Sequence, residues 1–357
     1  MNSECKLILV STFRHFYMSV GLAFNEPDTR FYLVFIDQVS DGLENKVFTA
    51  AEAMEGPFGG VECLPAKSSS RKKSKVRSLG FARLRDILLD IRPSEIITGN
   101  DRRLEFQYAM HFCRSHLKLP AKGAFIDDGT GSYISFHNNN QLRNLSDKYI
   151  DTPLKKIAYG KWYQRPSVFG ASDWVDLCYL AHPELAPEAL LGKEIIELKR
   201  EYYTSSDSRK YFECFSEVLD DVVFPELGKS GVLFVLPHSS MISSIYGSVE
   251  NLKCKLLQLA ARYSDSVVYF KYHPRELGDP VALIELGVPL TSSVPAELYC
   301  SLFNFDLIIG DVSTALMAAK WLTPEADVRY LPVQSIEGEL IAELFQKIDI
   351  SPLSLEL

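Results

Sequence analysis

Short apolar runs alternate along the chain with longer stretches whose apolar residues recur at every third or fourth position. The short runs predict buried strands and the longer stretches predict helices with one apolar face, an alternation that is typical of α/β proteins. In the first half of the chain we expect strands at residues 6–11, 30–36, 95–99 and 123–127. We expect helices in the same half at residues 13–24, 79–91 and 104–117.

The middle of the chain, residues 151–227, is interrupted by prolines, and its pattern predicts helices at residues 194–203 and 211–222. A Gly-Lys-Ser-Gly turn at residues 228–231 precedes a second alternating series. In this series we expect strands at residues 232–236, 267–272, 307–310 and 328–331. We expect helices in the same series at residues 249–262, 296–303, 314–322 and 337–347.

Two series of the same kind predict an α/β fold with two Rossmann-like domains that face a central cleft. The length of 357 residues also suits two domains. We place the first domain at residues 1–228, with a helical middle segment, and the second domain at residues 229–331.

The composition excludes several classes of protein. The net charge of −8 at pH 7 argues against a dedicated nucleic-acid binder. No apolar run has the length needed to span a bilayer, and we find no signal-peptide pattern. The seven cysteines include no C-x-x-C pair, so we expect a reduced, cytoplasmic protein with neither a disulfide framework nor a structural zinc site.

One short segment, residues 67–77, departs from the acidic balance. It carries six basic side chains, which are Lys67, Arg71, Lys72, Lys73, Lys75 and Arg77. A run of like charges is usually an exposed loop, and this is the simpler interpretation. The alternative is a patch that contacts anionic lipid head groups, which would place the protein peripherally on the inner membrane.

The first group of candidate chemical residues is Asp127-Asp128-Gly129, which directly follows a predicted strand. Strand ends of this kind point at the ligand crevice in open α/β sheets. Side chains alternate along a strand, so one carboxylate can point into the cleft while the other braces the loop. A cleft carboxylate can accept a proton from a hydroxyl nucleophile. The alternative is a turn without a catalytic role.

The second group is His273-Pro274-Arg275, which also follows a strongly apolar predicted strand. Pro274 restricts His273 to an extended backbone and so fixes the direction of the imidazole. A histidine and an arginine at a strand end suit an anionic ligand. The alternative is a histidine that only stabilises the loop.

The third group is Ser313-Thr314, at the predicted junction between a strand and a helix. Their hydroxyls and the free amides of the helix start form an anion site, unless they only cap the helix. Glu297 lies at the start of another predicted helix. Its carboxylate could accept hydrogen bonds from a ribose diol, or simply interact with the helix dipole.

The order of these groups resembles the bacterial sialyltransferases, most closely the lipooligosaccharide sialyltransferase family. Those families share a D/E-D/E-G motif, an HP motif and an S/T-S/T motif in this order, here at residues 127–129, 273–274 and 313–314. The resemblance implies a GT-B architecture, with CMP-sialic acid bound mainly by the C-terminal domain. It also implies that residues 332–357 return to the N-terminal domain.

The resemblance further implies an inverting glycosyltransferase that moves sialic acid from CMP-sialic acid to a galactose-terminated bacterial surface glycan, such as a lipooligosaccharide, a capsule or an O-antigen. Asp128 would be the general base, with Asp127 as the second candidate. His273 would meet the charge that develops on the leaving phosphate, and Ser313 and Thr314 would hold the same phosphate.

Other residues would contact the nucleotide. Glu297 matches the position that binds the cytidine ribose in related sialyltransferases. The remaining candidates for the nucleotide or the donor carboxylate are Pro274, Arg275, Ser239 and Ser240. We expect no cofactor and no metal, because the sequence has no D-x-D motif.

Several alternatives remain open at this point. The donor could be CMP-Kdo or another nucleotide sugar, and a non-catalytic protein that binds nucleotide sugars or glycans could keep the same fold. The motifs do not distinguish 2,3, 2,6 and 2,8 linkages, and they do not identify the acceptor. They also leave the oligomeric state open, a homodimer included.

Overall fold

The computed structural model describes residues 4–37, 45–65, 73–134, 151–219, 223, 225, 231–274, 276, 279–292, 294–332 and 336–353. The chain divides into two compact units, Met1–Tyr202 and Tyr203–Leu357. This division lies earlier than the boundary expected near residue 228, because helix α9 (Ser206–Val218) groups with the second unit. In that unit the Arg209 guanidinium of α9 donates a hydrogen bond to the Leu302 carbonyl (2.9 Å).

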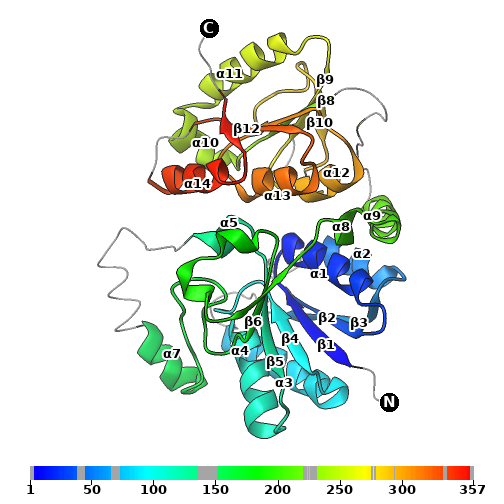
Figure 1. The fold of residues 1–357 in the computed structure, drawn as a ribbon, viewed down its shortest axis with the longest axis vertical. Helices are drawn as coiled ribbons and strands as arrows, with labels where there is room; N and C mark the ends of the chain where they lie inside the picture. The colour runs from blue at the N-terminus through cyan, green and yellow to red at the C-terminus, as the bar shows by residue number, and fades with distance from the viewer. Residues whose placement is uncertain are drawn as a thin grey trace. The chain divides into compact units, whose positions relative to one another are not determined.

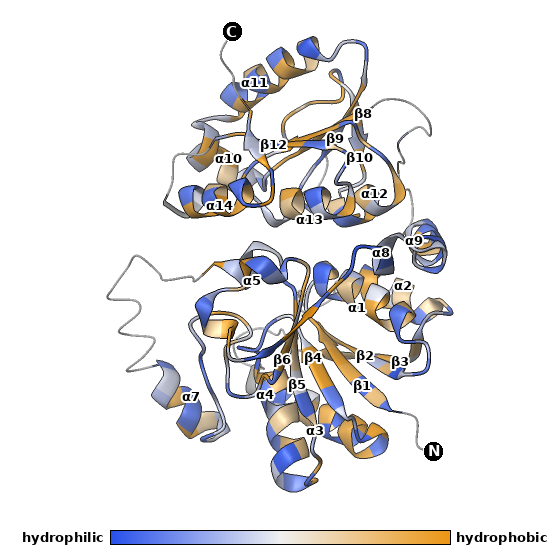
Figure 2. Cartoon of the chain, in the orientation of Figure 1, coloured by the Kyte–Doolittle hydropathy of each residue, from blue (hydrophilic) through white to orange (hydrophobic). Residues whose placement is uncertain are grey.

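A seven-stranded parallel sheet forms the centre of the first unit (Figure 1). Its strand order is β3-β2-β1-β4-β5-β6-β7. The strands are β1 (Cys5–Val10), β2 (Arg30–Asp37), β3 (Phe58–Pro65), β4 (Glu95–Thr98), β5 (Lys122–Ile126), β6 (Leu177–Leu180) and β7 (Glu194–Glu197). β1 and β4 are buried along their whole length, which is expected of parallel strands covered on both faces. In Figure 2 the middle of this sheet is correspondingly hydrophobic.

Helices follow most strands of the first unit. They are α1 (Phe13–Asn25), α2 (Lys46–Ala53), α3 (Lys73–Ile91), α4 (Leu104–His111), α5 (Thr130–Tyr133), α7 (Thr152–Tyr159) and α8 (Glu201–Thr204), the last of which spans the division between the units. A π-helical turn (Phe112–His116) continues α4, and two 3₁₀ turns (Pro183–Leu185 and Glu188–Leu190) follow β6. α1 begins after Thr12, whose hydroxyl accepts a hydrogen bond from the His15 backbone N–H (3.2 Å).

The second unit repeats the design with a six-stranded parallel sheet of order β10-β9-β8-β11-β12-β13. The strands are β8 (Gly231–Val235), β9 (Val267–Lys271), β10 (Val288–Leu290), β11 (Leu307–Gly310), β12 (Asp327–Tyr330) and β13 (Ser351–Pro352). The helices besides α9 are α10 (Ser239–Tyr246), α11 (Val249–Arg262), α12 (Ala296–Leu302), α13 (Thr314–Leu322) and α14 (Ile336–Gln346). The expected α/β class is therefore confirmed in both units.

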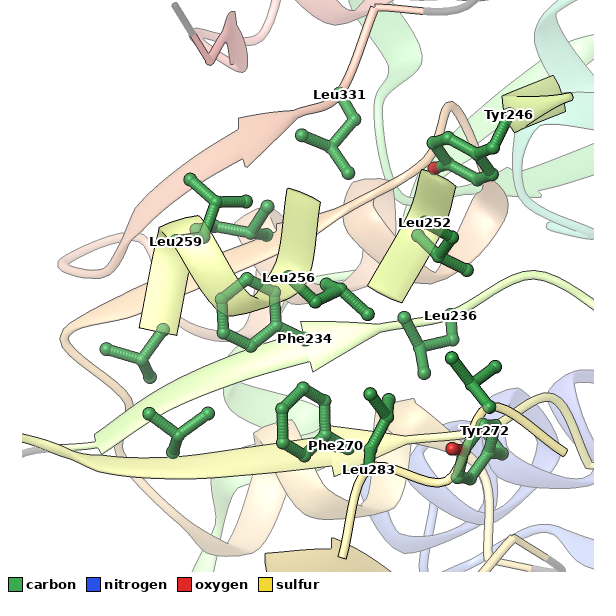
Figure 3. Packing of buried hydrophobic residues seen from close by; sticks show 14 of the residues in the cluster. Phe234, Leu236, Tyr246, Leu252, Leu256, Leu259, Phe270, Tyr272, Leu283 and Leu331 are labelled. Atoms are coloured by element: carbon green, nitrogen blue, oxygen red, sulfur yellow. The ribbon is translucent and has the colours of Figure 1, made fainter. Parts of the chain in front are cut away.

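A helix packed on the sheet forms the core of the second unit. The stacked rings of Phe234 on β8 and Phe270 on β9 lie 5.4 Å apart between centroids. Leu252, Leu256 and Leu259 on α11 are fully buried against them (Figure 3). The spacing of these leucines places them on one face of the helix, so α11 packs this apolar face against strands β8 and β9.

One expectation is corrected. Residues 194–203 do not form one helix, because Glu194–Glu197 pair with β6 as the edge strand β7 and only Glu201–Thr204 are helical. The last strand, β13, pairs with β12 in the second unit, and the expected return of residues 332–357 to the N-terminal domain stays a prediction. Residues 66–72, which hold half of the basic segment, lie outside the described residues.

Candidate functional site

The expected carboxylate pair follows β5, and the structure gives its two members different environments. The side chain of Asp127 is fully buried, whereas that of Asp128 is 22% exposed. The backbone then turns at Gly129, whose φ of 78° lies in the left-handed region that favours glycine. The two carboxylates thus differ in exposure, and the expectation that one of them points into a cleft while the other braces the loop stays a prediction.

Asp127 is held by a network of buried donors. The Arg14 guanidinium lies 2.7 Å from its Oδ1, and the Tyr133 hydroxyl donates to its Oδ2. The backbone N–H groups of Gly129 (2.6 Å) and Ala181 (3.1 Å) also donate to this carboxylate. Burial alone would raise the pKa of Asp127, but the charge of Arg14 and these hydrogen bonds hold it below the ordinary value. Both oxygens of the Asp127 carboxylate therefore accept hydrogen bonds from within the protein.

Asp128 instead contacts a histidine that the sequence analysis did not single out. The His15 Nε2 atom lies 2.7 Å from Asp128 Oδ1, and His15 itself is only 1% exposed. On the other side of the ring, the Ser11 backbone N–H donates to Nδ1 (3.4 Å). This bond makes Nδ1 the acceptor, so we assign the ring proton to Nε2, which donates it to the Asp128 carboxylate.

Gly99 makes room for this contact. It follows β4, the strand that lies between β1 and β5 in the sheet. A Cβ atom at this position would lie 2.1 Å from both Nε2 and Cδ2 of His15. The imidazole therefore reaches from α1 to the end of β5 only because Gly99 has no side chain.

The second candidate site is a pocket of about 410 Å³ in the second unit. Five of the predicted residues line it: His273 and Pro274 after β9, Glu297 at the start of α12, and Ser313 and Thr314 at the start of α13. They come from three separate segments of the chain. The structure thus brings these three stretches together around one pocket, and the roles expected of them there stay predictions.

Two ionisable side chains that line this pocket, one buried and one partly exposed, have perturbed pKa values. Lys271 is 1% exposed, and burial lowers its pKa to about 7 while Glu297 acts in the opposite direction. Its Nζ atom donates to the backbone carbonyls of Tyr272 and Ser292, the latter at 3.0 Å. Burial also raises the pKa of Asp311 to about 6. Both groups line the pocket, and sequence reasoning missed both.

His238 is a further pocket residue that the sequence analysis missed. Its ring is nearly perpendicular to that of His273, with 5.3 Å between the centroids. Its Nε2 lies 3.4 Å from Glu276 Oε1, which also accepts a hydrogen bond from the Ser239 backbone N–H (2.5 Å). A histidine just before a helix carries no distinctive local pattern, so its position was not predictable.

Two predicted residues do not join this group. Ser239 and Ser240 form the first turn of α10, and within the described part of the chain they are not among the residues that line the pocket. The Ser240 hydroxyl lies 2.8 Å from His238 Nδ1, so it can position that ring. Arg275 lies outside the described residues.

The described residues lack two kinds of feature. They contain no group of three or more histidine, cysteine, aspartate or glutamate side chains that could hold a metal ion. None of the helices formed by these residues has both the length and the apolar character required of a transmembrane helix.

Comparisons with known proteins give both a family and a fold. A family model described as Alpha-2,8-polysialyltransferase (POLYST) matches residues 6–331. No curated protein sequence matches the chain. Among solved structures, the chain is similar to the α/β-galactoside α-2,3-sialyltransferase of the luminous marine bacterium Photobacterium phosphoreum, with a TM-score of 0.59, 13% identity and 99% of each chain covered.

Two other solved structures share the architecture. The chain is similar to Phytolacca americana UGT2 complexed with UDP-2-fluoroglucose and pterostilbene, with a TM-score of 0.53, 12% identity, and 99% of this chain and 86% of that chain covered. It is also similar to UDP-GlcNAc 2-epimerase from Neisseria meningitidis, with a TM-score of 0.52, 11% identity and coverages of 98% and 87%. At these identities the likenesses establish the fold alone, which is the GT-B type with two Rossmann-like domains.

Proposed function

The chain belongs to the alpha-2,8-polysialyltransferase (POLYST) family and is therefore a sialyltransferase, and from this premise we propose that it extends a sialic-acid-terminated glycan with α-2,8-linked sialic acid taken from CMP-sialic acid. The family replaces the narrower resemblance to the lipooligosaccharide sialyltransferases. In this proposal the acceptor is the glycerol side chain of a terminal sialic acid and not a galactose.

The observation that carries the proposal is the partly exposed carboxylate of Asp128, which the buried His15 contacts. A general base needs one oxygen within reach of the acceptor and a fixed orientation. His15 engages Oδ1 at 2.7 Å, which leaves Oδ2 to take the proton of the acceptor hydroxyl. Asp127 cannot serve in this role because its carboxylate is fully buried and paired with Arg14. We therefore assign the base to Asp128 and the bracing role to Asp127.

The proposed reaction is a single inverting displacement. The acceptor hydroxyl gives its proton to Asp128 as its oxygen forms a bond to the anomeric carbon of sialic acid. The bond between that carbon and the phosphate oxygen breaks at the same time, and the electron pair leaves with CMP. The transition state is oxocarbenium-like, by analogy with other glycosyl transfers.

We assign the leaving CMP to the pocket of the second unit. The start of α13 offers backbone N–H groups and the Ser313 and Thr314 hydroxyls, and helix starts of this kind favour phosphate. His273 lines the same pocket and can donate to the phosphate as its charge grows. Lys271 holds the Tyr272 carbonyl just before His273, so it supports the direction of that turn. Glu297 suits the ribose hydroxyls.

A product assay with matched variants tests this function. The full chain is incubated with CMP-sialic acid and a fluorescent α-2,8-linked trisialic acid, and we expect a ladder of longer products and stoichiometric CMP release, with or without EDTA. Asp128→Asn should lower kcat by about 100-fold or more, the usual range for a lost general base. Its calorimetric affinity for CMP should stay unchanged.

The exposed carboxylate of Asp173 provides the control, since Asp173→Asn should behave like the wild type. An enzyme that uses CMP-Kdo or a UDP-hexose in place of CMP-sialic acid would overturn the donor assignment. CMP binding without CMP release on any acceptor would show a binding protein and not a transferase.

A further inference from the structure

A short helix at the edge of the first unit exposes apolar side chains that no described residue covers. None of the residues of α7 is buried, and the helix lies at the periphery of the unit (Figure 1). Leu154 is 59% exposed and Ile157 is 83% exposed. Together with the exposed Ala158 they occupy positions i, i+3 and i+4, which share one face of a helix.

Cationic side chains surround this apolar face. Residues 151–165 contain four basic residues and one carboxylate, which gives them a net charge of +3 in a chain of net charge −8. Lys156 and Lys161 are exposed, whereas Lys155 and Arg165 pair with Asp151 at 2.8 and 2.9 Å. A helix with an apolar face and basic flanks is the pattern of a segment that lies in a lipid interface.

A second basic element lies beside the same helix. Arg77 on α3 donates a hydrogen bond to the Tyr159 hydroxyl, and its guanidinium carbon lies 5.4 Å from the centroid of that ring. The ring of Tyr159 also packs edge-on against Phe81 of α3, with 6.4 Å between the ring centroids. Tyr159 and Arg77 therefore attach α7 to the unit, which leaves Leu154 and Ile157 exposed next to the exposed Lys156 and Lys161.

From this arrangement we propose that α7 and its basic surroundings form a docking surface for anionic lipid. Leu154 and Ile157 enter the boundary of the acyl chains while Lys156 and Lys161 pair with the head groups. A polyanionic glycan would also attract the lysines, but it gives no reason for two large apolar side chains in water. The combination therefore favours a lipid surface.

Vesicle sedimentation of the full chain tests the proposal without using catalysis. We expect binding to vesicles of phosphatidylglycerol and phosphatidylcholine, weakening as salt is raised, and little binding to phosphatidylcholine alone. Leu154→Ser combined with Ile157→Ser should weaken binding at least about tenfold. Lys156→Ala combined with Lys161→Ala should weaken it about 30-fold, at about fivefold for each lysine near an anionic surface.

Matched variants control for exposure and charge. Leu191 and Ile284 are 67% and 69% exposed, so Leu191→Ser with Ile284→Ser removes similar apolar surface elsewhere. Lys210→Ala with Lys347→Ala removes two exposed lysines elsewhere. Both control pairs should bind vesicles like the wild type.

Three results would overturn the proposal. The first is equal vesicle binding by the α7 variants and their controls, or no binding by the wild type. The second is a change of oligomeric mass in the α7 variants, which would assign the face to a second copy of the chain. The third is displacement from the vesicles by oligosialic acid at constant ionic strength, which would assign it to a glycan. None of these depends on whether the chain transfers sialic acid.

Discussion

Replacing His15 with phenylalanine tests how the Asp128 carboxylate is held. The imidazole is 1% exposed and its Nε2 lies 2.7 Å from Asp128 Oδ1, so phenylalanine can fill a similar volume without donating a hydrogen bond. A hydrogen bond to a charged group contributes about 1.5–3 kcal/mol. If this energy serves to orient the base, kcat should fall about 10- to 150-fold, at 1.36 kcal/mol for each factor of ten.

The assay is CMP release at saturating CMP-sialic acid and acceptor. His15→Gln keeps an N–H donor and should recover part of the lost rate, a result that a purely structural role does not predict. The KM for CMP-sialic acid should change less than about threefold, since the expected nucleotide contacts belong to the second unit. A folded His15→Phe variant, checked by circular dichroism and thermal melting, with kcat within twofold of the wild type would refute the reasoning.

Three further predictions concern groups around the two sites. Asp127→Ala removes the carboxylate that lies 2.7 Å from the buried Arg14 guanidinium and should lower the free energy of unfolding in urea by about 3–5 kcal/mol at pH 7, the usual cost of breaking a buried ion pair by removing one partner. Because the pKa of Asp127 is held below its ordinary value of 3.8, this difference should begin to shrink as the pH falls below about 4, and a difference that stays constant down to pH 2 would contradict the ion pair. Gly99→Ala should displace the His15 ring and lower kcat as His15→Phe does, while Gly192→Ala, whose Cβ would meet nothing within 4 Å, should be neutral. Burial lowers the pKa of Lys271 to about 7. The unfolding free energy of the wild type should therefore rise with pH between about 7 and 10.5, relative to that of Lys271→Met, by at most about 1.4 kcal/mol per pH unit. Parallel plots of unfolding free energy against pH for the two proteins would disprove the neutral buried lysine.

The elements that the sequence predicts well are those whose burial follows a regular local pattern. Helix Val249–Arg262, strand Leu307–Gly310 and helix Thr314–Leu322 begin and end as expected. β7 was missed because its four residues, flanked by charged side chains, fit a helical spacing equally well. Pairing with β6, which the local sequence does not encode, decides its conformation.

The candidate site shows the same division between local and distant information. The residues at strand ends, Asp128, His273 and Thr314, were predictable because parallel strands present their carboxyl ends to a ligand. His15 was not, because its partner Asp128 is 113 residues away and an interior position of α1 carries no signal of its own. Lys271 was missed because a lysine within an apolar strand identifies neither its burial nor its carbonyl partners.

The pairing of neighbouring residues explains how the Asp128 carboxylate, the proposed base, is held in place. Arg14 and His15 are adjacent on α1, Asp127 and Asp128 are adjacent after β5, and each member of one pair contacts one member of the other. The Arg14 pair is buried and fixes the loop, and this in turn fixes the position of Asp128 beside His15. The strand β4 lies between these two segments, and Gly99 at its end lets His15 pass. Because the backbone couples the two contacts, loss of the Arg14–Asp127 pair should loosen Asp128 even if the protein stays folded. Arg14→Lys keeps the charge but not the planar guanidinium group. It should therefore raise the activation free energy that corresponds to kcat by more than it lowers the free energy of unfolding.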